Sequence, residues 1–176
     1  MNEIRLITPT SEYSDDIMRF RNEILNSDDR DSFAGCGNLA ECSTAKEWLD
    51  SIFRMEKPDT CPEGFVTSNT YIAIRISDNK IVGVIDLRHH INHPVLGLWG
   101  GHMGYSVRPS ERNKGYAKEI LRLNLQNCKD KGIDNIMVTC HSWNIASEKA
   151  ILANGGVFEK EVLVDDEYIK RYWIYL

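Results

Sequence analysis

The sequence predicts an α/β fold in which a mixed, mostly antiparallel central sheet is flanked by helices. Two apolar runs on either side of Asp78-Asn79 have the pattern of a β-hairpin, and a second hairpin is predicted near the C-terminus. Between the hairpins a strand, a helix and a strand follow one another, which implies parallel pairing through a right-handed crossover. The chain has 176 residues, 42% of them hydrophobic, so we expect residues 1–176 to form a single domain with a proper core.

The N-terminal part alternates short elements with long polar loops. Residues 3–8 predict a first strand closed by Pro9, and Ser11 suits the N-cap of a helix over residues 12–26. A second helix is predicted after Thr44, its N-cap, because apolar side chains recur there at helical spacing. The segments before and after this helix are rich in glycine and proline and are expected to be loops.

The rest of the chain supplies most of the sheet. Strands are predicted over residues 70–77, 80–87, 98–107, 135–140, 158–164 and 168–175. A helix from Ala117 is expected to end at Gly132, and the last helix begins at Asn144 and also ends at glycine. Three glycines within residues 98–107 indicate a bulge, or the close approach of a ligand or another backbone.

The segment 107–117 joins a strand to a helix and has the composition of an anion site. Pro109 lacks an N–H and stops the preceding ladder, whereas Gly115 lets the backbone approach a ligand without a Cβ in the way. The N–H groups in the first turn of the following helix point back into the loop. Three basic side chains surround it: Arg112, Lys114 and Lys118. Such charge suits a diphosphate better than a carboxylate.

Two common phosphate-binding loops do not fit this segment. A Walker-type loop ends in Gly-Lys-Ser/Thr, but here Lys114-Gly115 is followed by Tyr116, so no hydroxyl is placed for Mg²⁺. A dinucleotide fold needs three glycines in Gly-x-Gly-x-x-Gly, and this loop holds one. A nucleoside triphosphatase and a dinucleotide-binding protein are therefore disfavoured.

The segment resembles the acetyl-CoA loop of the GCN5-related N-acetyltransferase (GNAT) family, which reads Val-x-Pro, a short spacer, then Arg/Gln-x-x-Gly-x-Gly/Ala. Val107, Pro109 and Arg112-Asn113-Lys114-Gly115-Tyr116-Ala117 match every specified position. The resemblance implies a GNAT-like fold with a parallel splayed pair of strands. It also implies direct transfer of an acetyl group from acetyl-CoA to a primary amine of a small molecule or protein in a ternary complex. The acetyl-CoA-binding residues implied are Val107, Arg112, Asn113, Lys114, Gly115, Tyr116, Ala117, Lys118, Asn144 and Ser147.

The residues that move protons in many members of that family are missing here. Gly101 stands where an acidic base is common, and Ile151 stands where a tyrosine acid is common. His102 and Asp86 are the candidate bases. The candidate acids are Tyr105, Tyr168 and Tyr172, although packing explains each of them better. A non-catalytic acyl-CoA-binding module of the same fold therefore stays open as an alternative, as does a donor such as succinyl-CoA.

Charge and cysteine content exclude several classes of protein. The net charge of −5 and the pI near 5.5 argue against a nucleic-acid surface. No apolar stretch approaches the roughly 18 residues of a membrane span, and residues 1–5 do not begin a secretory signal. We therefore expect a cytoplasmic protein with no nucleic-acid or membrane partner; a homodimer stays open. The five cysteines contain no Cys-x-x-Cys pair and fit reduced thiols without a metal. The pair Cys140-His141 could indicate a nucleophilic cysteine. Cys140 ends an apolar strand, however, and is better explained as a core residue.

Overall fold

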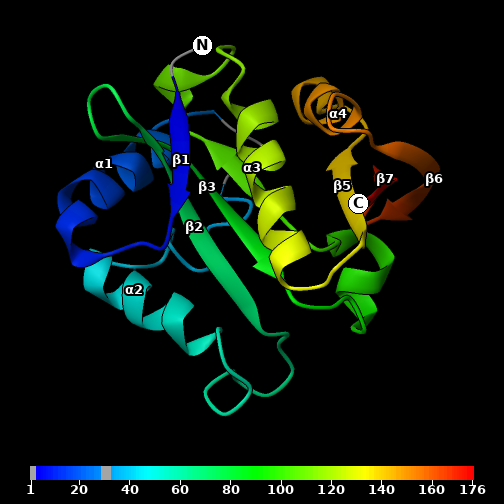
Figure 1. Cartoon of the computed structure of the whole chain (residues 1–176), viewed down its shortest axis with the longest axis horizontal. Coiled ribbons are helices and arrows are strands. Elements are labelled where there is room, and N and C mark those ends of the chain that lie inside the picture. The colour runs from blue at the N-terminus through cyan, green and yellow to red at the C-terminus, as the bar shows by residue number, and fades with distance from the viewer. Residues whose placement is uncertain (1–2, 29–32) are drawn as a thin grey trace.

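The computed structural model describes residues 3–28 and 33–176, which contain two β-sheets (Figure 1). The strand order is β1-β2-β3-β4 in the first sheet and β5-β7-β6 in the second, and all neighbours are antiparallel. The strands are β1 (Ile4–Ile7), β2 (Ser68–Arg75), β3 (Lys80–Arg88), β4 (Tyr105–Val107), β5 (Asn135–His141), β6 (Val157–Val164) and β7 (Glu167–Tyr175). The helices are α1 (Ser14–Leu25), α2 (Ala45–Arg54), α3 (Tyr116–Asp130) and α4 (Ile145–Leu152). Within the described ranges, no helix has the length and apolar character that crossing a membrane requires.

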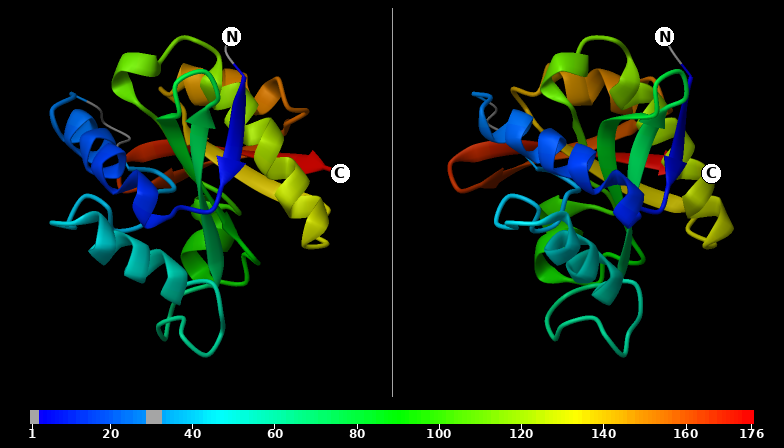
Figure 2. Two further views of the ribbon diagram at one scale, coloured as in Figure 1. Left: turned by 60° about the vertical axis from the view of Figure 1, so that its left-hand side comes forward. Right: turned by 90° about the vertical axis from the view of Figure 1, so that its left-hand side faces the viewer.

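Helices cover both faces of the first sheet (Figure 2). On one face lie α1 and α2, whose Phe20 and Trp48 share a buried cluster with Ile72 and Ile74 of β2. On the other face lies α3, whose cluster includes Ala73 of the same strand. The alternation of side chains along a strand explains this division, because residues 72 and 74 point one way and residue 73 the other.

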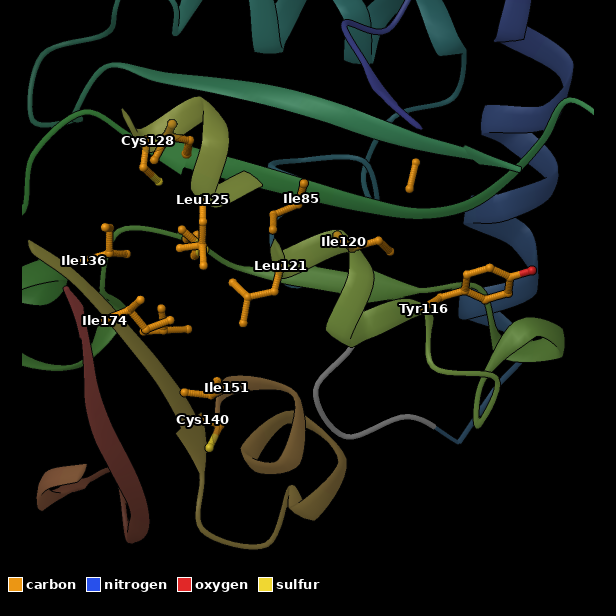
Figure 3. Close-up of a cluster of buried hydrophobic side chains, with 14 of the residues drawn as sticks. Ile85, Tyr116, Ile120, Leu121, Leu125, Cys128, Ile136, Cys140, Ile151 and Ile174 are labelled. Atoms are coloured by element: carbon orange, nitrogen blue, oxygen red, sulfur yellow. The ribbon is translucent and has the colours of Figure 1, made fainter. Parts of the chain in front are cut away.

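The helix α3 packs between the two sheets. Its buried face consists of Tyr116, Ile120, Leu121, Asn124, Leu125 and Cys128. Figure 3 shows the apolar side chains of this face beside Ile85 of β3, Ile136 of β5, Ile151 of α4 and Ile174 of β7. Each large apolar side chain buried in this way stabilises the fold by about 1.5–3 kcal/mol. The packing therefore fixes the N-terminus of α3 relative to both sheets.

The helix ends predicted at Thr44 and Gly132 are confirmed. Thr44 caps α2 in a capping box, since its Oγ1 accepts from the backbone N–H of Glu47 and the Glu47 carboxylate accepts from the backbone N–H of Thr44. Gly132 ends α3 with φ +71, in the left-handed region. The prediction that Ser11 caps the first helix is wrong. Ser11 begins a 3₁₀ turn, and its carbonyl accepts from the hydroxyl of Ser14, where α1 starts.

The first hairpin has a longer loop than predicted. Arg75 pairs with Lys80, so residues 76–79 form the loop, and the prediction of a two-residue turn is wrong. The guanidinium of Arg75 donates two hydrogen bonds to the carboxylate of Asp78, at 2.8 and 2.6 Å. This bidentate pair stabilises the wider loop and leaves the apolar Ile76 exposed.

The prediction of one strand over residues 98–107 is wrong. The segment Leu96–Gly100 forms a turn of π-helix, and β4 is only three residues long. Gly101 has φ +68, a conformation that ends the helical turn and that an extended strand does not contain. The predicted bulge is therefore a helical turn instead. The alternative, close approach of another backbone, is confirmed, because a Cβ would lie 2.7 Å from the Met137 carbonyl oxygen at Gly101 and 2.7 Å from the Gly35 nitrogen at Gly104.

The strands β4 and β5, on either side of α3 in the sequence, form no ladder with each other in the described part of the chain. β4 pairs with β3, and β5 pairs with β7. Their segments meet where the backbone N–H of His102 donates to the carbonyl of Met137, at 2.8 Å. Further along, both strands line a cavity. The parallel pairing that the crossover predicted is therefore absent as a ladder, and the two strands separate beyond this hydrogen bond.

Candidate active site

A cavity of about 830 Å³ lies where the two sheets separate. Its walls come from β4, the loop and first turn of α3, the end of β5, and α4. Residues distant in sequence meet there, including Val107, Gly115, His141 and Ser147. The volume is within the roughly 300–1,000 Å³ typical of small-molecule and cofactor sites.

The N-terminus of α3 opens into this cavity. Gly115 precedes the helix with φ +85, which glycine adopts without strain. No side chain caps the helix, so the N–H groups of its first turn receive no side-chain oxygen. The helix dipole adds about half a positive charge at this point. The arrangement suits an anionic ligand such as a diphosphate.

Glu111 is a buried carboxylate in the loop before α3. It accepts hydrogen bonds from Arg75 and Lys80, both at 2.8 Å, and from Lys114 at 2.9 Å. Burial raises the pKa of Glu111, but the hydrogen bonds from Lys80, Lys114 and Arg75 outweigh it and lower the pKa to about 2. These pairs tie the loop to the β2–β3 hairpin. Sequence reasoning missed this residue, and the available signal was an acidic residue within an otherwise basic loop.

All but one of the predicted acetyl-CoA-binding residues line the cavity. The exception is Lys114, whose Nζ donates to the Ser110 carbonyl at 3.0 Å and to the Glu111 carboxylate. Arg112 lines the cavity, and its Nε donates to the carbonyl of Val107 at 3.2 Å. That places the Arg112 guanidinium beside the backbone of Val107, which is also one of the predicted acetyl-CoA-binding residues.

The start of α4 is linked to β4 by a hydroxyl pair. Asn144 is the N-cap, because its side-chain oxygen accepts from the backbone N–H of Ser147 at 3.1 Å. The hydroxyl of Ser147 lies 2.7 Å from the hydroxyl of Tyr105, and all three residues line the cavity. Tyr105 thus brings a phenolic proton donor to the cavity wall.

The two candidate bases lie outside the cavity lining. His102 is buried, and its Nδ1 accepts a hydrogen bond from the backbone N–H of Met137 at 3.0 Å. Burial and the positive charge of Arg88 lower the pKa of His102 to about 4. Asp86 accepts from the backbone N–H of Gly104 at 2.6 Å and from Arg88 at 3.0 Å. Both side chains hold together the segment that precedes β4.

The other positions considered for proton transfer, 101, 151, 168 and 172, also contribute no side chain to the cavity lining. A Cβ on Gly101 would lie 2.7 Å from the carbonyl oxygen of Met137, so no side chain fits there. Ile151 is completely buried in the core around α3. Tyr172 is buried and donates to Glu148 at 2.6 Å, whereas Tyr168 is exposed, and neither lines the cavity.

Sequence reasoning missed the polar face of β5. Thr139 and His141 alternate with the buried Val138 and Cys140, and both line the cavity. The hydroxyl of Thr139 donates to the Trp99 carbonyl at 2.6 Å, which joins β5 to the π-helical turn. The signal that could have found this face was the pair of polar residues at alternate positions in an otherwise apolar strand.

Metal ligation has no support among the described residues. No group of three or more His, Cys, Asp or Glu side chains in residues 3–28 and 33–176 is arranged to hold a metal ion. Burial raises the pKa of the Cys36 and Cys128 thiols to about 12, so both stay protonated at neutral pH.

Comparison with known proteins identifies the family. The acetyltransferase (GNAT) domain family matches residues 4–157, whereas comparison with curated proteins gave no significant match. Among solved structures, RimL, a ribosomal L7/L12 α-N-protein acetyltransferase in complex with coenzyme A, has a TM-score of 0.69 and 12% identity, over 100% of this chain and 96% of that chain. The ribosomal-protein-S5-alanine acetyltransferase from Vibrio fischeri has a TM-score of 0.65 and 18% identity, over 98% and 91% of the two chains. A GNAT-family acetyltransferase from Bacillus anthracis has a TM-score of 0.61 and 17% identity, over 99% and 96%.

These structures share the predicted α/β fold, with a mostly antiparallel sheet and flanking helices. At such low identities they establish the fold alone, and the family match over residues 4–157 carries the assignment. The chain therefore belongs to the GNAT family of acetyltransferases and is an acyltransferase.

Proposed function

We propose that this protein transfers an acetyl group from acetyl-CoA to a primary amine by direct attack in a ternary complex, with residues 1–176 acting as one catalytic unit. The observation that carries the proposal is the uncapped N-terminus of α3, which opens into a cavity between β4 and β5. RimL, which has the same fold, is known in complex with coenzyme A. When bound, acetyl-CoA supplies an activated thioester and an anionic diphosphate.

The loop before α3 is the proposed diphosphate site. The backbone N–H groups after Gly115 would donate to the phosphate oxygens, and Arg112 and Lys118 would add positive charge. Asn144 and Ser147, on the opposite wall, would fix the arm of the cofactor. Lys114 would act indirectly, through its ion pair with Glu111, rather than by direct contact.

Tyr105 is the proposed acid among the three tyrosines considered. It lines the cavity, and its hydroxyl is oriented by the hydroxyl of Ser147 at 2.7 Å. A phenol there can protonate the departing thiolate. We do not carry His102 forward as the base, because its Nδ1 lone pair already accepts from Met137 and proton uptake would break that bond.

The acceptor we propose is the α-amino group at a protein N-terminus. Two of the three solved structures described above are named as acetyltransferases of ribosomal proteins, one of them as an α-N-protein acetyltransferase. An α-amine has a pKa near 8, against about 10.4 for lysine, so less help is needed to deprotonate it. The described lining of the cavity contains one carboxylate, Glu111, and three cations already bind it. Because no free carboxylate base is present in this lining, an acceptor that is easily deprotonated suits the cavity best.

Binding of CoA measured by calorimetry tests the cofactor assignment. Gly115→Asp should weaken CoA at least about 100-fold, since it places negative charge where the diphosphate would lie. Gly132→Asp is the matched control, because Gly132 also has positive φ, flanks the same helix at its other end and has open space around it. Equal loss in both variants, or none in either, contradicts the assignment.

Thiol release from acetyl-CoA across a panel of amines tests the reaction. We expect turnover with peptides that have a free N-terminus and none with the same peptides after N-terminal blocking. Firm CoA binding without thiol release would instead favour the acyl-CoA-binding module. Replacing acetyl-CoA by succinyl-CoA in the same assay tests the donor.

A further inference from the structure

A histidine and a glutamate form an ion-pair geometry in the wall of the cavity. Nδ1 of His141, at the end of β5, lies 2.8 Å from Oε2 of Glu167, at the start of β7. The same carboxylate oxygen accepts from the indole N–H of Trp143 at 3.0 Å. The rings of His141 and Trp143 stack, with centroids 5.0 Å apart and planes at 15°. Two residues of this group, His141 and Trp143, line the cavity.

The Glu167 carboxylate bears on which ring nitrogen of His141 carries the lone pair. Its contact with Nδ1 is an ion pair by distance. Negative charge beside Nδ1 favours the proton on that nitrogen, which leaves the lone pair of the neutral ring on Nε2. The arrangement is the opposite of that in His102, whose Nδ1 is the acceptor. His141 also keeps 27% of its side chain exposed, whereas His102 is buried. A base needs both the lone pair and this access.

No other described residue in the cavity lining offers the same chemistry. His141 is the one histidine among the described residues of the lining, and histidine is the side chain whose ordinary charge change falls between pH 5 and 8. Glu111, the one carboxylate among the described residues of the lining, is bound by three cations.

We propose that His141 is the general base for the acceptor amine and that Glu167 is a positioning residue that holds its tautomer and orientation. The proposal rests on the proposed acetyl transfer. Nε2 takes one proton from the acceptor ammonium, and the amine nitrogen then forms a bond to the thioester carbonyl carbon. The C–S bond breaks with its electron pair on sulfur, the thiolate receives the second proton through Tyr105, and the imidazolium releases its proton to water. The products are the amide, the CoA thiol and one proton.

The surrounding charges leave this role to His141. The charged groups on the neighbouring elements, besides Glu167, include Glu148 and Lys149 of α4, Glu161 of β6, and Lys170 and Arg171 of β7. Lys170 is paired with Glu148 at 2.8 Å, and Glu148 also accepts from Tyr172. Glu161 accepts from the hydroxyl of Ser142 and lies outside the cavity lining. None of these carboxylates therefore competes with His141 for the proton of a ligand in the cavity.

The test compares His141→Asn, Glu167→Gln and the control His90→Asn, an exposed histidine outside the cavity lining. The readouts are CoA affinity by calorimetry, the circular dichroism spectrum, and kcat/KM against pH with an N-terminal peptide. We expect His141→Asn to lower kcat/KM at pH 7 by at least about 100-fold and Glu167→Gln by about tenfold, with CoA affinity nearly unchanged. The loss should shrink above about pH 8, where the α-amine is already deprotonated.

Each result bears on the proposal separately from the cofactor assignment. A wild-type pH profile in His141→Asn overturns the role of His141, and an equal loss at every pH shows a structural role instead. If His141→Asn does not fold, Glu167→Gln decides by the same pH criterion. Wild-type protein that binds CoA but transfers no acetyl group overturns the base and leaves the cofactor site standing, whereas absence of CoA binding overturns the proposed function itself.

Discussion

Replacing Glu111 by glutamine should destabilise the fold by about 3 kcal/mol at neutral pH. The side chain is 5% exposed and accepts from Arg75, Lys80 and Lys114 at 2.8–2.9 Å. Its pKa falls from 4.5 to about 2 in the folded protein. Since a tenfold change in proton affinity is worth about 1.4 kcal/mol, the ionised carboxylate contributes about 3 kcal/mol. Glutamine forfeits this contribution and leaves buried cations without their counter-charge.

The pH dependence of stability gives the sign of the effect. Because the folded pKa lies below the unfolded one, the contribution of Glu111 is fully present above about pH 4.5 and is lost as the pH falls towards 2. Urea denaturation at several pH values measures it as the difference in unfolding free energy between wild type and variant. That difference should shrink from about 3 kcal/mol at pH 7 towards zero at low pH.

Glu119→Gln is the matched control for this experiment. Glu119 lies on α3 and pairs with Arg122 at 2.7 Å, but that arginine is 57% exposed. Solvent screens such a pair, so the expected loss is below about 1 kcal/mol. Equal losses in the two variants, or a loss in Glu111→Gln that does not vary with pH, would refute the reasoning from buried charge.

Three further predictions concern the acid, a buried histidine and a helix cap. Tyr105→Phe should lower kcat by about tenfold or more with CoA affinity retained, as measured by steady-state kinetics and calorimetry; an unchanged kcat removes Tyr105 as the acid. His102, whose pKa is lowered to about 4, stays neutral in the fold, so wild-type stability should fall between about pH 6.5 and 4 while His102→Gln lacks this dependence. Parallel denaturation curves at all pH values would contradict that. Thr44→Ala should cost about 1 kcal/mol in urea denaturation by removing the cap of α2, and a loss below about 0.3 kcal/mol would mean that the cap is dispensable.

Local patterns predicted much of the fold and part of the candidate site. Thr44 was predicted as an N-cap, and it caps α2 in the structure, where Glu47 completes a capping box. Gly132 follows the last apolar position of a helix, and it adopts the left-handed conformation expected there. Likewise, the loop before α3 combines one glycine with basic residues over a few positions, and most of it lines the cavity. In each case the determining residues are close in sequence.

Features that depend on residues far apart in sequence could not be predicted. Glu111 pairs with Arg75 and Lys80, which lie on a different hairpin, and no local pattern links them. His141 and Glu167 meet only because β5 and β7 are neighbours in the second sheet. Single sequence patterns carry no information on such register. The strand prediction for residues 98–107 failed for another reason. The glycines of this segment permit a helical turn as readily as a strand.

The backbone around Gly101 explains why we place the proposed proton transfer elsewhere. A side chain at 101 would meet the Met137 carbonyl, and that carbonyl accepts the hydrogen bond from His102 that joins the two sheets. An acidic residue at this position would therefore break the contact from which β4 and β5 separate. Further along β5, Thr139 and His141 line the cavity. Their backbone groups pair with β7 in the second sheet. A side chain on this face can exchange a proton without disturbing the junction of the sheets, which favours β5 as the source of the base.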